Sequence, residues 1–470
     1  SEYENASTQM MTVQEAARML NADWHGDDLA FGDVSTDSRQ IKAGDLFVAL
    51  SGDRFDGHDY IGDTIERGAV AALVAREIKK TKLPQHFGWI HVANTRLALG
   101  QLASQWRDRF SLPLVAVTGS NGKTTVKEMI ASIFTKAASR QSNFTTDASI
   151  DQVLATIGNL NNDIGVPLTL LRLRQHHVYA VVEMGMNHAG EIAYLTQLAK
   201  PDIAVITNAG SAHIEGLGSI ELVAHAKGEI FQGLDKSGVA IINADDKYAQ
   251  LWYQLAGNRQ VISFGMNSKA QIRADCHLLA SSNKWILKFP KEESEIELQV
   301  LGQHNVMNAL AAAAAALGAG VSEQVIIEGL SAFSGVKGRM QKKSGLHQAT
   351  LIDDTYNANP ASVSAALSVL AHLSGRKILV LGDMGELGVG GADLHRKIGE
   401  EASRAGIEKL LALGELSVNA VEGFGKGAMH FSNIDELLGE AEKLLDHNVT
   451  MLVKGSRFMK MERVIQRFEV

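Results

Sequence analysis

Cysteine and long apolar runs are nearly missing from this chain. Of its 470 residues only Cys276 is a cysteine, which excludes an internal disulfide and fits a reducing compartment. The longest strongly apolar run, ALAAAAAALGAGV at 309–321, is shorter than the roughly 20 residues that a membrane helix needs. The N-terminal stretch SEYENASTQM is polar and acidic, unlike a secretory signal. These features predict a cytoplasmic protein without membrane insertion.

Basic clusters and proline are also scarce. The net charge is -8 and no block of lysine and arginine occurs, which argues against nucleic acid as the main partner. Six prolines are too few for long polyproline linkers. A chain of 470 residues is nevertheless too long for one hydrophobic core, so we expect about three domains.

The first predicted domain, residues 1–112, is a small α/β unit. The segment TVQEAARML at 12–20 has a helical pattern, and DLFVAL (45–50) and VAALVA (70–75) are typical of short buried strands. The run HDYIGDTIERGA between these strands favours a helix.

A change of pattern begins the second predicted domain, residues 113–332. Its strands LVAVTG, YAVVEMG, DIAVITN and GVAIINAD are near-continuous apolar runs, as in a parallel sheet covered on both faces. Residues 262–302 are typical of a meander of strands, whereas residues 140–152 have no clear period and are predicted to be a loop. Polar or glycine residues follow the strands, where ligands bind in open α/β folds.

The third predicted domain, residues 333–470, again alternates strands and helices. Its strands are ATLIDD, KILVLGD, KLLALG and TMLVKGS. The sequence therefore predicts an α/β protein of three domains. These are a small α/β unit, a central P-loop-type unit with a mostly parallel sheet, and a C-terminal Rossmann-like unit.

The strongest local signal is VAVTGSNGKTT at 115–125, where an apolar strand leads into a glycine-rich turn and a helix. Small residues let the backbone aim N–H groups at phosphate oxygens, and the helix N-terminus adds positive potential. A lysine there would reach the terminal phosphates, and a threonine hydroxyl would face Mg²⁺. An ordinary strand–turn–helix corner is the alternative. The expected nucleotide-binding residues are Gly119, Ser120, Asn121, Gly122, Lys123, Thr124 and Thr125.

The spacing of the glycines is unusual. Two residues separate Gly119 from Gly122, whereas the usual P-loop has four residues between its glycines. This GxxGKTT arrangement after a strand resembles the ATP-dependent amide ligases of the Mur and folylpolyglutamate synthetase superfamily. The resemblance covers the whole chain, because the three-domain plan of that family fits the predicted boundaries. It implies ATP and two Mg²⁺ ions as cofactors.

The resemblance also implies metal-binding residues. Glu183, in VVEMGMNHAGEI, would bind magnesium with Thr124, since a hard cation prefers oxygen ligands. His213 and Lys227 have the spacing seen in family members, in which the lysine is often carbamylated, and the anionic carbamate would hold a second Mg²⁺. Without the resemblance, Glu183 is predicted to be a surface carboxylate and Lys227 a solvated helix lysine.

Further nucleotide contacts follow from the resemblance. The segment GQHNVMNALAA matches the adenine side, with Asn305 and Asn308 at the helix start, although Asn305 also suits a helix cap. Arg339 would approach the γ-phosphate, and Asp354 would contact the ribose from the third domain. ATP would therefore bind between the second and third domains, and closure would complete the site. The implied catalytic residues are Lys123, Glu183, His213, Lys227 and Arg339.

The N-terminal segment STDSRQIKAGDLFVALSGDRFDGHDYI at 35–61 resembles the UDP-binding domain of the later Mur ligases. Folylpolyglutamate synthetases lack this domain, so their substrate is disfavoured. The expected contacts to the nucleotide sugar are Ser38, Arg39 and Arg54.

The motifs GNLNNDIGVPLTLL, DDTYNANPAS and LGDMGELG resemble the family members that join D-alanyl-D-alanine to a UDP-N-acetylmuramoyl-tripeptide. They would place Asn162, Asn357 and Asn359 at the substrates, with Asp383 a further candidate. The DNPR motif of the ligases that add a single third residue is missing. The polar loop at 140–152 is longer than is usual in the family.

The implied chemistry is amide formation by a monomeric enzyme. The terminal carboxylate of the tripeptide attacks the γ-phosphate, giving an acyl phosphate and ADP, and the amine of the dipeptide then displaces phosphate. Lys123, Arg339 and two Mg²⁺ ions would offset the repulsion between carboxylate and triphosphate. The base for the incoming amine stays open between His213 and water.

Three alternatives to this function are considered. A P-loop NTPase switch would hydrolyse ATP alone, and a sister ligase would add a single amino acid. A silent nucleotide-binding scaffold would lack some of the four residues Glu183, His213, Lys227 and Arg339, all of which are present. The sister ligase is therefore the main alternative.

Overall fold

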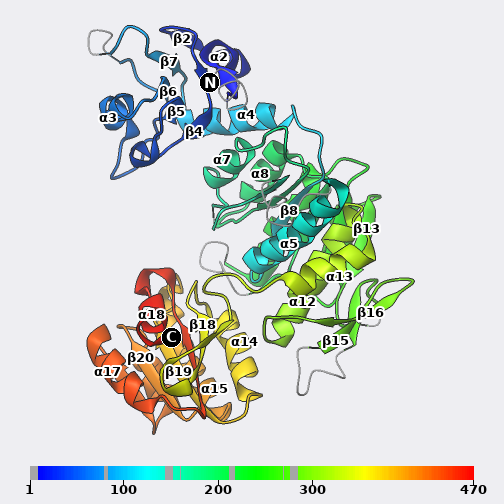
Figure 1. Ribbon diagram of the computed structural model, residues 1–470, viewed down its shortest axis with the longest axis vertical. Coiled ribbons are helices and arrows are strands. Elements are labelled where there is room, and N and C mark those ends of the chain that lie inside the picture. Colours follow the sequence, from blue (N-terminus) through cyan, green and yellow to red (C-terminus); the bar gives the residue numbers. More distant parts are fainter. Residues whose placement is uncertain are drawn as a thin grey trace.

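The computed structural model describes residues 9–78, 83–142, 152–158, 160–210, 218–267, 269–275 and 284–470. Three α/β units follow one another along the long axis, with the N-terminal unit at one end and the C-terminal unit at the other (Figure 1). The predicted α/β class is confirmed. Within the described ranges, no helix combines the length and apolar character needed to cross a membrane.

The N-terminal unit contains a five-stranded sheet in the order β2-β7-β6-β5-β4. Strand β2 is antiparallel to β7, and the other pairs are parallel. The predicted helix near 12–20 and both predicted strands are confirmed, whereas β2, β4 and β7 were not predicted. The elements are β1 (Met11–Thr12), α2 (Val13–Leu20), β2 (Asp23–His25), β3 (Ala30–Phe31), β4 (Asp33–Ser35), β5 (Asp45–Val48), α3 (Ile61–Glu66), β6 (Ala71–Val74), β7 (Gly88–His91) and α4 (Thr95–Arg107).

The central unit is built on a six-stranded, fully parallel sheet in the order β13-β12-β11-β8-β10-β9. Its four predicted strands are confirmed, and β9 and β13 add the two edges. The strands are β8 (Leu114–Thr118), β9 (Val153–Ala155), β10 (Tyr179–Glu183), β11 (Ile203–Ile206), β12 (Val239–Asn243) and β13 (Gln260–Phe264).

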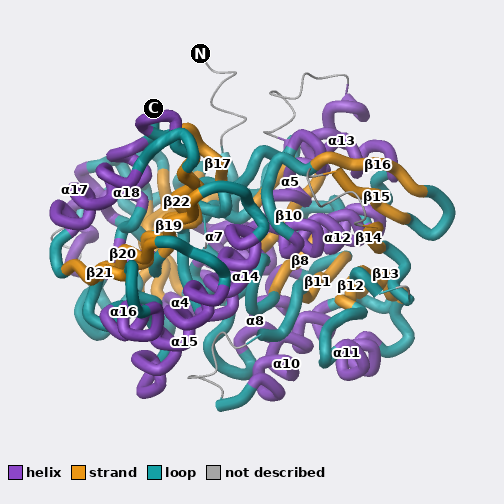
Figure 2. Tube along the Cα trace, turned by 90° about the horizontal axis from the view of Figure 1, so that it is seen from below, coloured by secondary structure: helices purple, strands orange, loops and turns teal. Residues whose placement is uncertain are grey.

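Side chains alternate across this sheet and form two cores. Val115 and Val117 of β8 face one core, which also contains α5 (Lys123–Ser142), α12 (Gln303–Gly318) and α13 (Glu323–Ala332). Leu114 and Ala116 face the other core, together with α7 (Gly165–Leu170), α8 (Glu191–Ala199), α10 (Ile220–Gly228) and α11 (Ala249–Ala256). Helices therefore cover both faces of the sheet, as the continuous apolar strands predict. Figure 2 shows α5, α12 and α13 on one side of the orange strands and α8, α10 and α11 on the other.

Two sequence predictions need correction here. The predicted meander at 262–302 begins within β13, which is instead the parallel edge of the central sheet, and only β14 (Arg273–Asp275), β15 (Lys284–Lys288) and β16 (Glu293–Glu297) form an antiparallel sheet. The predicted loop at 140–152 is wrong at its start, because α5 continues to Ser142. Residues 143–151 of that loop lie outside the described residues.

The C-terminal unit has a six-stranded sheet in the order β17-β18-β22-β19-β20-β21, in which only the β17–β18 pair is antiparallel. Helices α14, α15 and α16 pack on one face, and α17 and α18 on the other. The four predicted strands are confirmed, and β17 and β21 were missed. The elements are β17 (Gln341–Ser344), β18 (Thr350–Asp354), α14 (Pro360–Ala371), β19 (Arg376–Gly382), α15 (Gly391–Arg404), β20 (Lys409–Leu413), α16 (Val418–Phe424), β21 (Ala428–Phe431), α17 (Ile434–Leu444), β22 (Val449–Lys454) and α18 (Glu462–Phe468).

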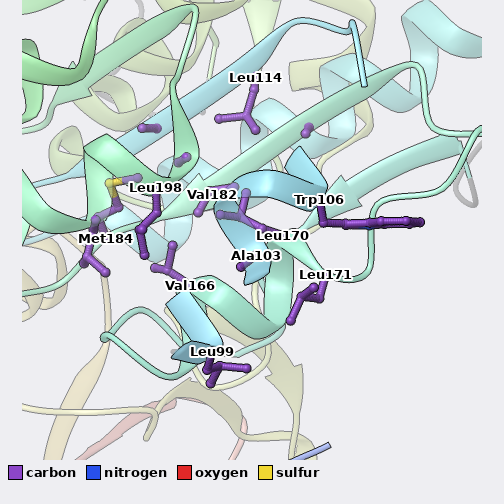
Figure 3. Packing of buried hydrophobic residues seen from close by; sticks show 14 of the residues in the cluster. Leu99, Ala103, Trp106, Leu114, Val166, Leu170, Leu171, Val182, Met184 and Leu198 are labelled. Atoms are coloured by element: carbon purple, nitrogen blue, oxygen red, sulfur yellow. The ribbon is translucent and has the colours of Figure 1, made fainter. Parts of the chain in front are cut away.

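Helix α4 attaches the N-terminal unit to the central unit. One apolar cluster runs from the N-terminal sheet through α4 to helices α7 and α8, so the two units share a core. Trp106 of α4 is buried, and its indole N–H donates to the Leu173 carbonyl at 3.1 Å. The buried Arg107 donates to the Ala199 carbonyl at 2.8 Å. Figure 3 shows this packing for Leu99, Ala103, Trp106, Val166, Leu170 and Leu171.

We expect Trp106→Ala to weaken this attachment. The change removes a buried aromatic ring and one hydrogen bond, which should lower the free energy of unfolding by about 3–5 kcal/mol. Denaturant unfolding followed by circular dichroism measures the change. Leu97→Ala is the matched control on α4, because Leu97 is 55% exposed and its loss should cost no more than about 0.5 kcal/mol. Equal effects of the two substitutions would contradict this account of α4.

Candidate active site between the central and C-terminal units

A cavity of about 1450 Å³ lies between the central and C-terminal units. Central residues at the carboxyl ends of β8, β10, β11 and β12 line one side of it, and segments that follow β18, β19 and β22 line the other. In open parallel sheets this edge is where ligands bind, next to the point at which the strand order reverses. The sequence predicted a site between these two units.

The glycine-rich loop after β8 forms one wall of the cavity, and its glycines are sterically required. Gly122 has φ +83°, and a Cβ atom there would overlap the side chain of Asn308. A Cβ atom at Gly119 would overlap the Thr207 hydroxyl, which itself donates to the Asn121 carbonyl at 2.7 Å. Thr207, which follows β11, therefore packs against one side of the loop, and the other side of the loop lines the cavity.

Lys123 begins helix α5 at this loop. Its Nζ lies 3.4 Å from the Gly119 carbonyl oxygen. Burial lowers the pKa of Lys123, the carboxylate of Glu183 partly offsets this effect, and the positive charge of Arg339 lowers the pKa further. An anion bound at the loop would stabilise the charged form of this lysine.

Glu183, at the end of β10, is fully buried, so the surface alternative for this residue is wrong. The Thr124 hydroxyl donates to its Oε1 at 2.8 Å, and the amide of Asn161 donates to the same oxygen at 3.3 Å. Its Oε2 has no hydrogen-bond partner among the described residues. A hydroxyl and an unsatisfied carboxylate oxygen are the hard oxygen ligands that Mg²⁺ prefers, so these residues fit a magnesium ion that is completed by phosphate oxygens and water.

Lys227 lies on α10 and is fully buried, which contradicts its prediction as a solvated helix lysine. Its Nζ has no hydrogen-bond partner among the described residues. Burial lowers the pKa of Lys227 well below its ordinary value, and the charge of Lys123 lowers it further. The amine is therefore driven toward its neutral, nucleophilic form. His213 lies outside the described residues, which contain no cluster of three or more His, Cys, Asp and Glu side chains with metal-binding geometry.

Arg339 belongs to a stack that the sequence did not predict. Its guanidinium carbon lies 4.1 Å from the centre of the Tyr356 ring, and that of Arg457 lies 4.8 Å from the same ring. The Arg339 Nε and the Tyr356 hydroxyl have no hydrogen-bond partner in the described part of the chain. Burial raises the pKa of Tyr356. The stack directs two cations at the cavity and fixes them by cation–π contact.

The nucleoside end of the predicted site also lines the cavity. Asp354 accepts from the Lys454 ammonium at 2.8 Å and from the backbone N–H of Met340 at 3.2 Å. The alternative role of Asn305 as a helix cap is wrong, because the N-cap of α12 is Gly302. The Asn305 amide instead donates to the Leu301 carbonyl at 2.7 Å.

Of the three asparagines that the sequence predicts to bind substrate, two line the cavity and one does not. Asn359 caps α14, and its amide donates to the Asn121 side chain at 3.0 Å, which connects the C-terminal unit to the glycine loop. Asn357 is exposed in the cavity wall. Asn162 does not line the cavity, and its side chain accepts from the backbone N–H of Gly165 at 2.8 Å. Its neighbour Asn161 lines the cavity instead.

Asp383 is also a scaffold residue. Its carboxylate accepts backbone N–H groups from Leu416 at 3.0 Å and Ser417 at 2.8 Å, and it does not line the cavity. These bonds hold the start of α16 against the end of β19. The presence of Asp383 in the GDMGEL motif is therefore explained by these hydrogen bonds within the C-terminal unit.

The remaining predicted residues lie on the N-terminal unit, away from this cavity. Ser38 is buried in a short helical turn. Arg39 has an 84% exposed side chain and pairs with Asp37 at 3.0 Å, which raises the pKa of Arg39. Arg54 is exposed.

Family models match three stretches of the chain. They are the Mur ligase family catalytic domain at 31–107, the Mur ligase middle domain at 117–316, and the Mur ligase glutamate ligase domain at 338–457. The chain is 39% identical over 465 residues to the UDP-N-acetylmuramoyl-tripeptide–D-alanyl-D-alanine ligase of Escherichia coli (strain K12), with 98% of each chain covered.

Two solved structures are similar over nearly the whole chain. A crystal structure of MurF from Acinetobacter baumannii matches with a TM-score of 0.87 and 36% identity, covering 97% of this chain and 98% of that one. A crystal structure of MurF ligase from Thermotoga maritima in complex with ADP matches with a TM-score of 0.79 and 25% identity, covering 93% of this chain and 96% of that one.

We expect Gly122→Ala to distort the glycine loop. The positive φ and the overlap with Asn308 should together lower the free energy of unfolding by about 1–3 kcal/mol. Gly62→Ala is the control, because Gly62 lies in helix α3 with open space around its Cβ position, and alanine should be neutral or stabilise by up to about 1 kcal/mol. Denaturant unfolding of both variants measures the difference, and a neutral Gly122→Ala would refute the steric requirement.

Proposed function

Because the chain belongs to the Mur ligase family, we propose that it joins D-alanyl-D-alanine to a UDP-N-acetylmuramoyl-tripeptide at the expense of ATP. The main observation in support of this function is that the glycine loop, the buried Glu183 and the stacked Arg339 line the same cavity. The names of the relatives and the nearly complete coverage of both chains support the choice of substrates.

We propose one substrate for each unit. Residues 1–112 bind the UDP-muramoyl peptide, residues 113–332 bind ATP, and residues 333–470 close on ATP and bind the dipeptide. The matched family models at 31–107, 117–316 and 338–457 fall inside these boundaries, which supports the division. Because residues of one chain line both sides of the cavity, we propose that the enzyme acts as a monomer. We also propose that it acts in the cytoplasm.

The proposed nucleotide site follows the cavity wall. The loop residues Gly119–Thr125 bind the phosphates through backbone N–H groups at the start of α5. Asn305 contacts the adenine and Asp354 the ribose, since both line the cavity beyond the loop. The ADP complex of the Thermotoga maritima relative supports a nucleotide in this fold.

Thr124 and Glu183 would hold a first Mg²⁺ ion, and His213 with a carbamylated Lys227 a second. When bound, the metal ions supply positive charge that neutralises the phosphate oxygens. A carbamate forms when a neutral amine attacks carbon dioxide and loses a proton. The buried, unpartnered Lys227 amine with its lowered pKa supports this modification.

The residues of the chain would carry the reaction mainly by electrostatics and positioning. An oxygen of the tripeptide carboxylate bonds to the γ-phosphorus while the bond to ADP breaks, and Lys123 and Arg339 stabilise the transferring phosphoryl group. The dipeptide amine then attacks the acyl carbon, loses a proton and expels phosphate. Tyr356 and Arg457 would keep Arg339 oriented through both steps.

The proposed substrate contacts lie on both outer units. Ser38, Arg39 and Arg54 would bind the nucleotide sugar on the N-terminal unit. Asn357 and Asn359 would meet the dipeptide on the C-terminal unit, where both line the cavity. We also propose Asn161, rather than Asn162, as the side chain that faces the acceptor, since Asn161 lines the cavity.

Phosphate release from ATP and Mg²⁺ with UDP-muramoyl-tripeptide, with and without D-alanyl-D-alanine, tests the function. We expect release to require the dipeptide and the product mass to rise by one dipeptide residue pair. Lys123→Ala should abolish release, because it removes the cation at the phosphates, whereas the α5 control Lys136→Ala should retain it.

Other outcomes identify the alternatives. Release with a single amino acid and a shorter acceptor would move the chain to a sister ligase. Equal release from ATP alone would identify an NTPase. Wild-type ligation by Lys123→Ala would refute the phosphate site.

The carbamate has its own test. In protein equilibrated with carbon-13-labelled bicarbonate, we expect a carbamate carbon signal in the NMR spectrum, because the Lys227 amine is buried and depleted of its proton. The signal should vanish in Lys227→Met and persist in Lys236→Met, whose lysine is exposed on the surface. A spectrum without a carbamate signal, or one that Lys227→Met leaves intact, would contradict the modification.

A further inference from the structure

A second lysine of α5, Lys127, lies one helical turn after Lys123 and is fully buried. Its Nζ donates to the carbonyl oxygen of Thr156 at 2.7 Å and to that of Gly158 at 3.2 Å. It also pairs with Glu128 at 2.8 Å and lies 3.9 Å from Oε2 of Glu183. One ammonium group thus joins helix α5, the segment after β9 and the carboxylate at the end of β10.

The segment after β9 wraps around Glu183. The Thr156 hydroxyl accepts from the backbone N–H of Glu183 at 2.9 Å. The Asn161 amide donates to Glu183 Oε1 at 3.3 Å, and the Asn161 carbonyl accepts from the Gly185 N–H at 2.8 Å. The position of the Glu183 carboxylate therefore depends on a segment whose carbonyl groups are held by Lys127.

Packing alone does not explain a lysine at this position. The neighbouring buried residues of α5 include Val126, Met129 and Ile130, so a methionine would fill the same space without a buried charge. Desolvating an ammonium is unfavourable unless it is paired and hydrogen-bonded, and an apolar replacement of similar size is often neutral or stabilising. The charge and the hydrogen bonds are what an apolar side chain would lose.

We propose that Lys127 is a positioning residue that fixes Glu183 for metal binding and couples it to the segment that meets the acceptor. Its ammonium balances the carboxylate oxygen that has no hydrogen-bond partner among the described residues. It also keeps the Thr156 and Gly158 carbonyls turned inward, so that Asn161 remains on Glu183. This inference rests on the proposed function.

Calorimetry measures the affinity for ADP with and without Mg²⁺ and so tests whether Lys127 positions Glu183 for metal binding. Steady-state kinetics with UDP-muramoyl-tripeptide tests whether Lys127 also affects the segment that meets the acceptor. In Lys127→Met, ADP affinity without Mg²⁺ should stay within about twofold, because the glycine loop is untouched. The gain in ADP affinity that Mg²⁺ adds should fall at least about tenfold, as is common when a residue that orients a metal ligand is lost. The KM for the tripeptide should rise while the KM for D-alanyl-D-alanine stays unchanged.

Lys136→Met is the matched control, a lysine-to-methionine change further along α5 at a partly exposed position, and it should leave all four quantities unchanged. If Lys127→Met does not fold, Lys127→Gln carries the same test, since it keeps an N–H donor but removes the charge. Wild-type values for the Mg²⁺ gain and for the tripeptide KM in the folded variant would overturn the proposal. Failure of the wild-type protein to bind ADP or the tripeptide would instead overturn the proposed function.

Discussion

Positive charge gathers around one buried carboxylate in this molecule. Lys127 lies 3.9 Å from Glu183, and the Glu183 carboxylate also raises the pKa of Lys123, whereas burial and the charge of Arg339 lower it. Such a cluster is costly in a protein interior unless further anions neutralise it. Triphosphate, carboxylate and carbamate are anions of this kind, so the positive charges of the cavity favour the proposed ligands.

The two outer units are attached to the central unit by different kinds of contact. Helix α4 shares an apolar core with the central unit, so separating them would expose buried side chains. The C-terminal unit meets the glycine loop through polar contacts such as the bond from Asn359 to Asn121 at 3.0 Å. Water replaces a polar contact at little cost. The C-terminal unit should therefore separate from the glycine loop more easily than the N-terminal unit separates from the central unit.

The sequence predicted those parts of the structure that local patterns encode. Continuous apolar runs identified the buried parallel strands, and the spacing of Gly119, Gly122 and Lys123 identified the loop. It did not reveal Lys127, Tyr356 or Lys454, since burial of a lysine and stacking of a ring depend on segments that are distant in the chain. It also did not show that Asn161 lines the cavity and Asn162 does not, because adjacent asparagines differ only in which way the turn directs them.

The shared core of α4 has a geometric consequence. With the N-terminal unit packed on the central unit through this core, the distance between the proposed UDP-binding surface and the glycine loop is fixed by the fold. An acceptor anchored at its nucleotide end would reach the phosphoryl group only when its peptide matches that span. Selection for a tripeptide over a shorter peptide would then depend on the length of the peptide. It would need few contacts to the individual side chains of the peptide.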